Sequence, residues 1–465
     1  MYQRAASVLI PAATAVAAVG LLVHWLVGRP VMNELTERVP LAPTTAQTVA
    51  AVDLRGDPIP GPGKPSALPG AWPRFRGPNG DGISPETTPL RKTFDAGGVP
   101  VLWKLDVGDG YAGAAIRDGR VYFLDYDDNE RADVFRCLSL DDGREIWRRS
   151  YRIHLSWDHG YSRTVPALHD RYAVVMGPKC HVTCVEADTG RFVWGLDLVK
   201  DFGATVPPWY AGQCVLIDRG RAILGVGGDA LLMAVDLPTG NIVWRSPNPR
   251  RWKMTHTSVV PMKLAGRDTY IYCASGGVAG VSADDGSILW ELPDWRVNIA
   301  AIASPLVIDD SRVFLSGGYG VGSMMIRITP GENGFHVTQL FRLKPEVFGA
   351  EQHTPILYQG HIFGVIPPPI GQFVCLDLEG RQVWASGGKR VFGLGGYILA
   401  DGAFWVLNDT GRLTVIEATT AGYRELATVQ VMDRAHDSWA PPAIASGLMI
   451  VRDTRRMFCL DLRRK

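Results

Sequence analysis

The feature that most constrains the fold is a short hairpin pattern that recurs along most of the chain. Each copy has an alternating strand, a tight turn containing Gly, and a second strand that ends in Trp; the Gly supplies the positive φ that such turns need. The five clear copies are CLSLDDGREIW (137–147), CVEADTGRFVW (184–194), AVDLPTGNIVW (234–244), GVSADDGSILW (280–290) and CLDLEGRQVW (375–384). Two degenerate copies, at 326–341 and 415–426, fill the gaps. Counted from Trp103, the copies end 42 to 51 residues apart, which is near the length of a four-stranded propeller blade.

A second strand pair lies between successive copies, for example at 164–177 and 303–318. Two hairpins per repeat give four antiparallel strands per blade. The last segment, 440–465, has three strands, whereas the Trp-bearing strand at 99–107 has no blade of its own. We therefore predict an all-β fold over residues 71–465, an eight-bladed β-propeller of four-stranded antiparallel blades. Pairing of its N- and C-terminal strands would close the ring and remove the open edges.

Composition agrees with a large folded protein of balanced charge. The 52 Gly and 32 Pro residues disfavour a helical bundle, and a hydrophobic content of 46% supplies a large core. The 48 Lys and Arg residues against 47 Asp and Glu residues leave a net charge of +1. We therefore expect no binding to nucleic acid through a basic patch.

The N-terminal segment has a different character. Residues 5–27 carry no formal charge and are long enough to cross a hydrocarbon core of about 30 Å. We predict that they form one uncleaved transmembrane helix that anchors the protein in the cytoplasmic membrane. Residues 1–4 would then be a short cytoplasmic end. Residues 28–70 show no periodicity and are predicted to be a Pro-rich, semi-extended linker.

The repeat and the string AWPRFRGPNGDGIS (71–84) resemble a known family, the pyrroloquinoline-quinone-like (quinoprotein-like) eight-bladed propellers, and the D-x-x-T-G-x-x-x-W hairpins are similar to that family's tryptophan docking motif. The resemblance covers residues 71–465. It implies a propeller outside the cytoplasm, so we expect a single-pass protein with its propeller in the periplasm or another extracytoplasmic space. The family includes quinone-dependent dehydrogenases and cofactor-free scaffolds such as the outer-membrane assembly lipoprotein, so the fold does not give the activity.

The cysteines favour the scaffold branch of that family. Four of the seven occupy one slot of four different repeats, where two other repeats hold small residues: Cys137, Cys184, Cys375 and Cys459, with Ala234 and Gly280. Equivalent positions on different blades lie too far apart for a disulfide, and we expect free, buried thiols. The dehydrogenases resembled here commonly carry a disulfide between adjacent cysteines, and the chain has no Cys-Cys pair. It has no Cys-x-x-Cys-His either, so covalent haem is unsupported.

Tryptophan and histidine mark a second feature. Six tryptophans end the repeat and are predicted to pack between blades: Trp103, Trp147, Trp194, Trp244, Trp290 and Trp384. Other aromatic and ionisable residues follow an outer strand and precede the next inner strand, so their connections should emerge at one end of the propeller. The predicted binding face comprises Trp157, His159, Tyr161, Trp209, Tyr210, Trp252, His256, Trp295, His353, His436 and Trp439.

Three interpretations of this face stay open at this point. The aromatic residues could cover the ends of the blades, since large rings often serve packing. They could form a protein-docking surface, because Trp, Tyr and Arg dominate interface energetics. They could also surround a cofactor, with Glu351, Asp437 and Asn298 as weak catalytic candidates, although none of these lies in a family motif that can be matched residue by residue.

The sequence favours a membrane-anchored, extracytoplasmic scaffold that is a subunit or accessory of a membrane complex. We expect its protein partners to be membrane proteins. We expect no cofactor, and no metal site, because histidines on separate blades lack metal-ligand spacing. The alternative is a dehydrogenase of alcohols or sugars that depends on pyrroloquinoline quinone and Ca²⁺.

Overall fold

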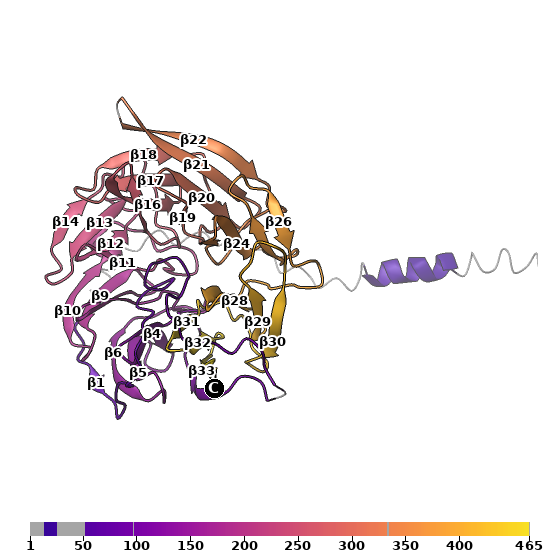
Figure 1. Cartoon of the computed structure of the whole chain (residues 1–465), viewed down its shortest axis with the longest axis horizontal. Coiled ribbons are helices and arrows are strands. Elements are labelled where there is room, and N and C mark those ends of the chain that lie inside the picture. Colours follow the sequence, from indigo (N-terminus) through magenta and orange to yellow (C-terminus); the bar gives the residue numbers. More distant parts are fainter. Residues whose placement is uncertain (1–13, 26–51, 96, 333, 465) are drawn as a thin grey trace, which may run out of the picture. The chain divides into compact units, whose positions relative to one another are not determined.

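The N-terminal unit contains one described helix. The computed structural model describes residues 14–25, 52–95, 97–332 and 334–464, and the chain divides into two units, Met1–Ala51 and Val52–Lys465. Residues 14–25 are helical (Figure 1). Within the described ranges, no helix combines the length and apolar character needed to cross a membrane. The remainder of the predicted span 5–27 lies outside those ranges, as do residues 1–4 and 28–51, so the anchor stays a prediction.

The second unit is a ring of eight antiparallel blades, with inner strands near the centre and strands such as β22, β26 and β30 at the rim (Figure 1). Blade 1 contains β3 (Ala115–Arg117), β4 (Arg120–Asp127), β5 (Ala132–Ser139) and β6 (Glu145–Arg152), and blade 2 contains β7 (Ala167–His169), β8 (Tyr172–Met176), β9 (His181–Glu186) and β10 (Phe192–Asp197). Blade 3 contains β11 (Leu216–Asp218), β12 (Arg221–Gly225), β13 (Leu232–Asp236) and β14 (Ile242–Arg245), and blade 4 contains β15 (Val260–Leu264), β16 (Arg267–Ala274), β17 (Gly277–Ser282) and β18 (Ile288–Leu292). A short helix, α2 (Leu198–Phe202), follows β10.

The other blades follow the same strand order. Blade 5 contains β19 (Leu306–Val307), β20 (Arg312–Gly317), β21 (Gly322–Gly331) and β22 (Gly334–Leu343). Blade 6 contains β23 (Ile356–Tyr358), β24 (His361–Val365), β25 (Phe373–Leu376) and β26 (Gln382–Ala385), and blade 7 contains β27 (Tyr397–Ala400), β28 (Ala403–Leu407), β29 (Arg412–Glu417) and β30 (Glu425–Gln430). Blade 8 contains β31 (Ala443–Ala445), β32 (Leu448–Arg452), β33 (Arg456–Asp461) and, as its outer strand, β2 (Val101–Asp106). The pairing of β2 with β33 confirms the predicted closure of the ring by both ends of the chain.

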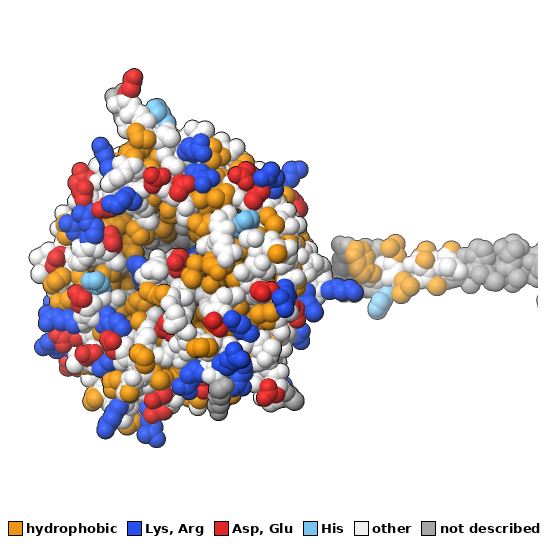
Figure 2. Space-filling model, in the orientation of Figure 1, with side chains coloured by type: hydrophobic (Ala, Val, Ile, Leu, Met, Phe, Trp, Pro, Cys, Tyr) orange, Lys and Arg blue, Asp and Glu red, His pale blue; other side chains and the backbone are white. Residues whose placement is uncertain are grey.

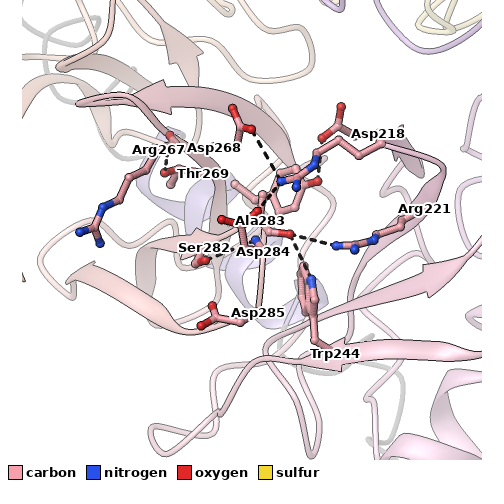
Figure 3. Close-up of polar contacts among 12 residues, drawn as sticks. Asp218, Arg221, Trp244, Arg267, Asp268, Thr269, Ser282, Ala283, Asp284 and Asp285 are labelled. Carbon is pink, nitrogen blue, oxygen red and sulfur yellow. Dashed lines mark hydrogen bonds and ion pairs between the residues drawn. The ribbon is translucent and has the colours of Figure 1, made fainter.

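In five of the blades, the repeated tryptophan donates a hydrogen bond to the next blade. The Nε1 atom of Trp244 on β14 donates a hydrogen bond of 3.2 Å to the carbonyl oxygen of Ala283, in the turn of blade 4, and Arg221 donates to the same oxygen (Figure 3). The turn glycine of that blade, Gly286, has a φ of +77°, and a Cβ there would lie 2.6 Å from the Trp244 ring. The turn therefore requires Gly both for its backbone conformation and for the approach of the ring.

Blade 5 lacks the tight Gly-containing turn of the five clear repeat copies, and this changes the contact made by the preceding tryptophan. The long hairpin of β21 and β22 replaces the turn and packs against β18. Trp290, at the end of blade 4, is buried, and its Nε1 atom has no hydrogen-bond partner among the described residues. The degenerate repeat at 326–341 is thus a blade hairpin, as predicted, but it lacks the carbonyl acceptor that the other turns provide.

The cysteine slot lies opposite the repeated tryptophan. Cys184 pairs with Trp194 across the outer hairpin of blade 2, and the three other slot cysteines pair in the same way with Trp147, Trp384 and Trp103. All seven cysteines are free and buried, which confirms both expectations. The slot takes a small side chain because the indole ring of its cross-strand neighbour covers it.

The predicted linker differs from the structure where the structure describes it. Residues 52–70 lie along the propeller instead of forming a free tether. Strand β1 (Ile59–Pro60) pairs with β6 as a fifth strand of blade 1, and Gly61 donates a 2.8 Å hydrogen bond to the carbonyl oxygen of Ile146. A Cβ on Gly61 would lie 2.1 Å from the Glu145 carbonyl oxygen, so the absence of a side chain at Gly61 permits this approach.

Residues 72–84 cross one end of the central channel. Trp72 forms a bridge with Ile116 on the inner strand of blade 1, whereas Ile83 forms one with Leu399 on the inner strand of blade 7. Between them, Arg76 donates hydrogen bonds of 2.6 and 2.9 Å to the carbonyl oxygens that precede β23 in blade 6. The segment that carried the family resemblance therefore spans the ring across its inner strands.

Candidate functional site

A cavity of about 370 Å³ lies on the propeller axis. Each of the eight blades supplies at least one lining residue from the connection before its inner strand. Phe75, from the segment that crosses the channel, also lines this cavity and a second one of about 170 Å³. The lining residues of the larger cavity are Phe75, Tyr111, His159, Arg163, Trp209, Gly212, Cys214, His256, Ser258, Ile299, Ile302, Tyr319, Glu351, Gln352, His353, Leu394, Trp439 and Pro441. Figure 2 shows one face of the propeller, hollowed near the middle of the ring.

A chain of hydrogen bonds between blades holds the cavity wall. The backbone N–H of Val165 in blade 2 donates to Sγ of Cys214 in blade 3 at 3.3 Å, and the N–H of Cys214 donates to Oγ of Ser258 in blade 4 at 3.0 Å. The N–H of Ser258 donates to Ser304 in blade 5 at 3.0 Å, and that of Ser304 donates to Thr354 in blade 6 at 2.8 Å. The same position of five consecutive blades is thereby tied together, which fixes the inner strands around the cavity.

Arg163 brings a positive charge to the wall. Its Nε atom donates to the carbonyl oxygen of Trp209, and its Nη2 atom donates to that of His159 at 2.6 Å. The guanidinium carbon lies 4.9 Å from the centroid of the Tyr111 ring, in cation–π geometry. Burial lowers the pKa of Arg163 from its usual value. An arginine side chain stays protonated in proteins even when it is buried. Arg163 therefore keeps a positive charge in the cavity wall, where backbone carbonyl dipoles stabilise it.

Two histidines of the wall are neutral. Burial lowers the pKa of His256 and of His353 to about 4. The Nε2 atom of each ring is buried without a partner among the described residues. A neutral imidazole has one N–H, so each Nε2 atom can accept a hydrogen bond when Nδ1 carries that proton.

Glu351 lines the cavity from the connection before β23. Burial raises the pKa of its carboxyl group, and a hydrogen bond from the Tyr319 backbone opposes the shift. Its side chain packs on Gly318, where a Cβ would lie 2.5 Å from Glu351 Cγ. Protonated Glu351 is thus more abundant at a given pH than an exposed glutamate would be, which reduces the negative charge in the cavity.

The structure brings together six of the predicted site residues: His159, Trp209, His256, Glu351, His353 and Trp439 all line the cavity. Three predicted members of the binding face are buried packing residues instead, namely Tyr161, Trp252 and Trp295. Tyr161 packs on Tyr126 at 4.2 Å between ring centroids, and Trp252 packs on Gly276 and Gly277. The surrounding blades cover the rings of these three residues.

The remaining predicted residues lie outside the cavity lining. The Trp157 side chain is 62% exposed and donates a 3.1 Å hydrogen bond from Nε1 to Asp109. His436 is exposed and lies 3.0 Å from Asp437, and Asn298 is exposed. Tyr210 is half-buried and donates to the carbonyl oxygen of Ser156. The weak catalytic candidates Glu351, Asp437 and Asn298 therefore do not form one group in the lining.

Sequence reasoning missed Arg163, Tyr111 and Tyr319. A signal for Arg163 exists, because a basic side chain directly precedes Thr shortly before the inner strand in three alternate blades, at Arg163–Thr164, His256–Thr257 and His353–Thr354. Tyr111 stacks on Trp439 with ring centroids 5.3 Å apart. Tyr111 and Tyr319 lie in the Gly-rich segments 110–113 and 317–322, which resemble plain turns.

The lining residues do not fit a Ca²⁺ and quinone pair. Ca²⁺ takes about six to eight oxygen ligands, commonly several carboxylates. Glu351 is the one carboxylate among the described residues that line the cavity, and the described residues contain no group of three His, Cys, Asp or Glu side chains able to hold a metal ion. No reaction step through such a pair follows from this geometry.

Comparison with solved structures supports the fold. The chain is similar to BamB from Moraxella catarrhalis, with a TM-score of 0.53 and 12% identity over 78% of this chain and 99% of that one. It is also similar to the quinohemoprotein alcohol dehydrogenase ADHIIG from Pseudomonas putida HK5, with a TM-score of 0.57 and 12% identity over 86% and 81%, and to the computationally designed Ika8 protein, with a TM-score of 0.51 and 10% identity over 80% and 100%. At these identities the likeness concerns the fold alone. No curated protein sequence matches the chain.

The blades, their tryptophan docking and the axial cavity define a pyrroloquinoline-quinone-like eight-bladed propeller. A family model described as outer membrane protein assembly factor BamB matches residues 130–386, more than half of the chain. The chain belongs to this BamB family, which confirms the predicted resemblance.

Proposed function

We propose that this protein is a membrane-anchored, extracytoplasmic scaffold that binds a protein partner through the loops around the mouth of the axial cavity. Two exposed apolar side chains at these loops carry the proposal. Trp157 is 62% exposed, and Ile299, which lines the cavity, is 54% exposed. An exposed Trp is costly in water and is the residue type most enriched at interface hot spots.

A ladder of rings connects the exposed Trp157 to the cavity wall. The ring centroids lie 5.8 Å apart from Trp157 to His159, 6.4 Å from His159 to Trp209, and 6.4 Å from Trp209 to His256. A partner residue seated on Trp157 would therefore continue a packed surface that leads inward. Membership of the BamB family supports a scaffold role, and the apolar residues 5–27 support the anchor.

Co-purification of the full-length protein from detergent-solubilised membranes tests the docking face. The variant Trp157→Ala should lower recovery of the stoichiometric partner, with a loss in binding of about 2 kcal/mol or more, as for a hot spot. Leu340→Ala is the matched control, because Leu340 is 39% exposed on β22, at the rim of blade 5. Equal recovery with both variants, at unchanged melting temperature, would exclude this face as the docking surface.

Lysine labelling tests the side of the membrane. Lys263 lies on β15 with a side chain that is 67% exposed. A membrane-impermeant amine reagent added to spheroplasts should modify this lysine. Modification that occurs only after the membrane is broken would contradict an extracytoplasmic propeller.

A further inference from the structure

The axial cavity has the walls, charge and unused acceptors of a ligand site. We propose that it binds an aromatic ring that carries a carboxylate, with the carboxylate on Arg163. The ligand would be either a free small molecule or the C-terminal aromatic residue of a polypeptide. The second source rests on the proposed scaffold function, whereas the first does not.

Aromatic and aliphatic groups form most of the wall. Trp209 and His256 are stacked with ring centroids 6.4 Å apart and an interplanar angle of 25°. Tyr111 and Trp439 are stacked at 5.3 Å and 14°. Aromatic pairs are favourable at centroid distances of about 4.5 to 7 Å, so a further ring placed between such walls gains both area and ring contacts. The cavity volume of about 370 Å³ is at the small end of the range for small-molecule sites.

The charge of the cavity favours an anion. Nε and Nη2 of Arg163 donate to carbonyl oxygens, and Nη1 donates no hydrogen bond within the part of the chain that the structure describes. A carboxylate is the acceptor that suits a guanidinium best, through short charge-assisted hydrogen bonds. The Arg163 guanidinium already lies over Tyr111, the position that a ligand cation would take on that ring. Glu351 is the one carboxyl group among the described lining residues, and burial raises its pKa.

Two acceptors would select a ligand with a polar hydrogen on or near its ring. Nε2 of His256 and Nε2 of His353 are buried and have no partner among the described residues, although both imidazoles line the cavity. When the single proton of the neutral imidazole is on Nδ1, each Nε2 accepts a hydrogen bond. An indole N–H, a phenol O–H or a peptide N–H could serve one of them, which makes an indole carboxylate a suitable probe.

Calorimetric titration of the full-length protein in detergent tests the site with three indoles of similar size. Indole-3-acetate should bind with one site per chain, indole-3-acetamide at least about tenfold more weakly, and tryptamine more weakly still, because a charge-assisted hydrogen bond supplies that discrimination. Arg163→Gln should reduce the binding of the acid to the level of the amide. Arg152→Gln, at a side chain that is 85% exposed on β6, is the matched control and should change neither.

Peptides separate the two sources. A short peptide with a C-terminal Trp as the free acid should bind more tightly than indole-3-acetate if the ligand is a polypeptide end, and its C-terminal amide should lose that advantage. Binding of indole-3-acetate without binding of the peptide acid assigns the site to a free small molecule. Equal binding of acid and amide by the unmodified protein, preference for tryptamine, or no binding of either acid overturns the proposal.

The variants also separate this inference from the proposed function. If ligand binding fails while Trp157→Ala still lowers recovery of the partner, the cavity assignment is wrong and the scaffold stands. If acid preference survives in Arg163→Gln, with circular dichroism showing a folded propeller, Arg163 is not the anion-binding group and the assignment is also wrong.

Discussion

Two tryptophans that differ in one hydrogen bond allow the docking of blades to be tested. Trp194 and Trp290 end equivalent strands and are both buried, at 6% and 4% exposure. Nε1 of Trp194 donates a 2.8 Å hydrogen bond to the Leu237 carbonyl oxygen, whereas Nε1 of Trp290 has no partner within the described ranges. Replacement of each by Phe removes the same atoms, so the difference between the two variants isolates the hydrogen bond.

The loss of ring volume should cost about 1–2 kcal/mol in either variant. In Trp194→Phe, the lost hydrogen bond and the carbonyl oxygen left without it add about 1 kcal/mol, so the total is about 2–3 kcal/mol. In Trp290→Phe, removal of a buried donor that has no acceptor stabilises the protein by about 1 kcal/mol or more. The total loss in the free energy of unfolding is then about 0–1 kcal/mol. We therefore expect a difference of about 2 kcal/mol in the free energy of unfolding.

Urea unfolding followed by far-ultraviolet circular dichroism measures this difference, because that signal does not depend on the replaced indole. The midpoints should separate while the slopes stay equal, which shows that stability and not the denatured state has changed. If Trp290→Phe loses as much stability as Trp194→Phe, the hydrogen bond to the next blade does not explain the repeated tryptophan.

The remaining predictions concern the slot, the cavity wall and pH. A Cβ on Gly280 would lie 2.0 Å from Trp290 Nε1, so Gly280→Ala should lower the melting temperature, whereas Cys184→Ala should cost about 1 kcal/mol or less. Ser258→Ala leaves the Cys214 N–H without its acceptor and should cost about 1–3 kcal/mol in urea unfolding; Ser287→Ala, on an exposed turn, is the control and should cost less. The pKa of about 4 for His353 in the folded chain lies below the value of 6.5 for a free imidazole, so the unfolded chain binds the extra proton first. Stability should therefore fall as the pH drops from 6.5 and level off below about 4, with at most about 3 kcal/mol from this group. His353→Gln should remove that part of the pH dependence and the exposed His436→Gln should not; identical profiles for both variants would contradict a buried neutral imidazole.

The blades could be predicted from the sequence because their signals are local. Gly286 and Trp244 stand in the same pattern in successive repeats, and each is required by a contact that recurs between neighbouring blades. The closure by β2 and β33 followed from counting strands. Residues 52–70 were missed because Gly61 binds through its backbone, which leaves no periodic side-chain pattern.

The site was only partly predictable for a different reason. Trp157 and Trp295 occupy equivalent connections, yet the first is 62% exposed and the second 2% exposed. Position in the repeat gives the end of the propeller on which a residue lies, but burial depends on contacts with the next blade, as in the Arg342 guanidinium over the Trp295 ring. Arg163 was missed because its role arises only when the inner strands of several blades meet around the axis.

Site-specific photo-cross-linking in intact membranes tests the docking face most directly. A photoreactive phenylalanine analogue at position 157 would stand at the exposed mouth of the cavity, and the same group at position 340 would stand on the outer strand β22. The scaffold account predicts one predominant cross-linked protein from position 157 that is absent from position 340. No adduct at position 157, or the same adducts from both positions, would contradict it.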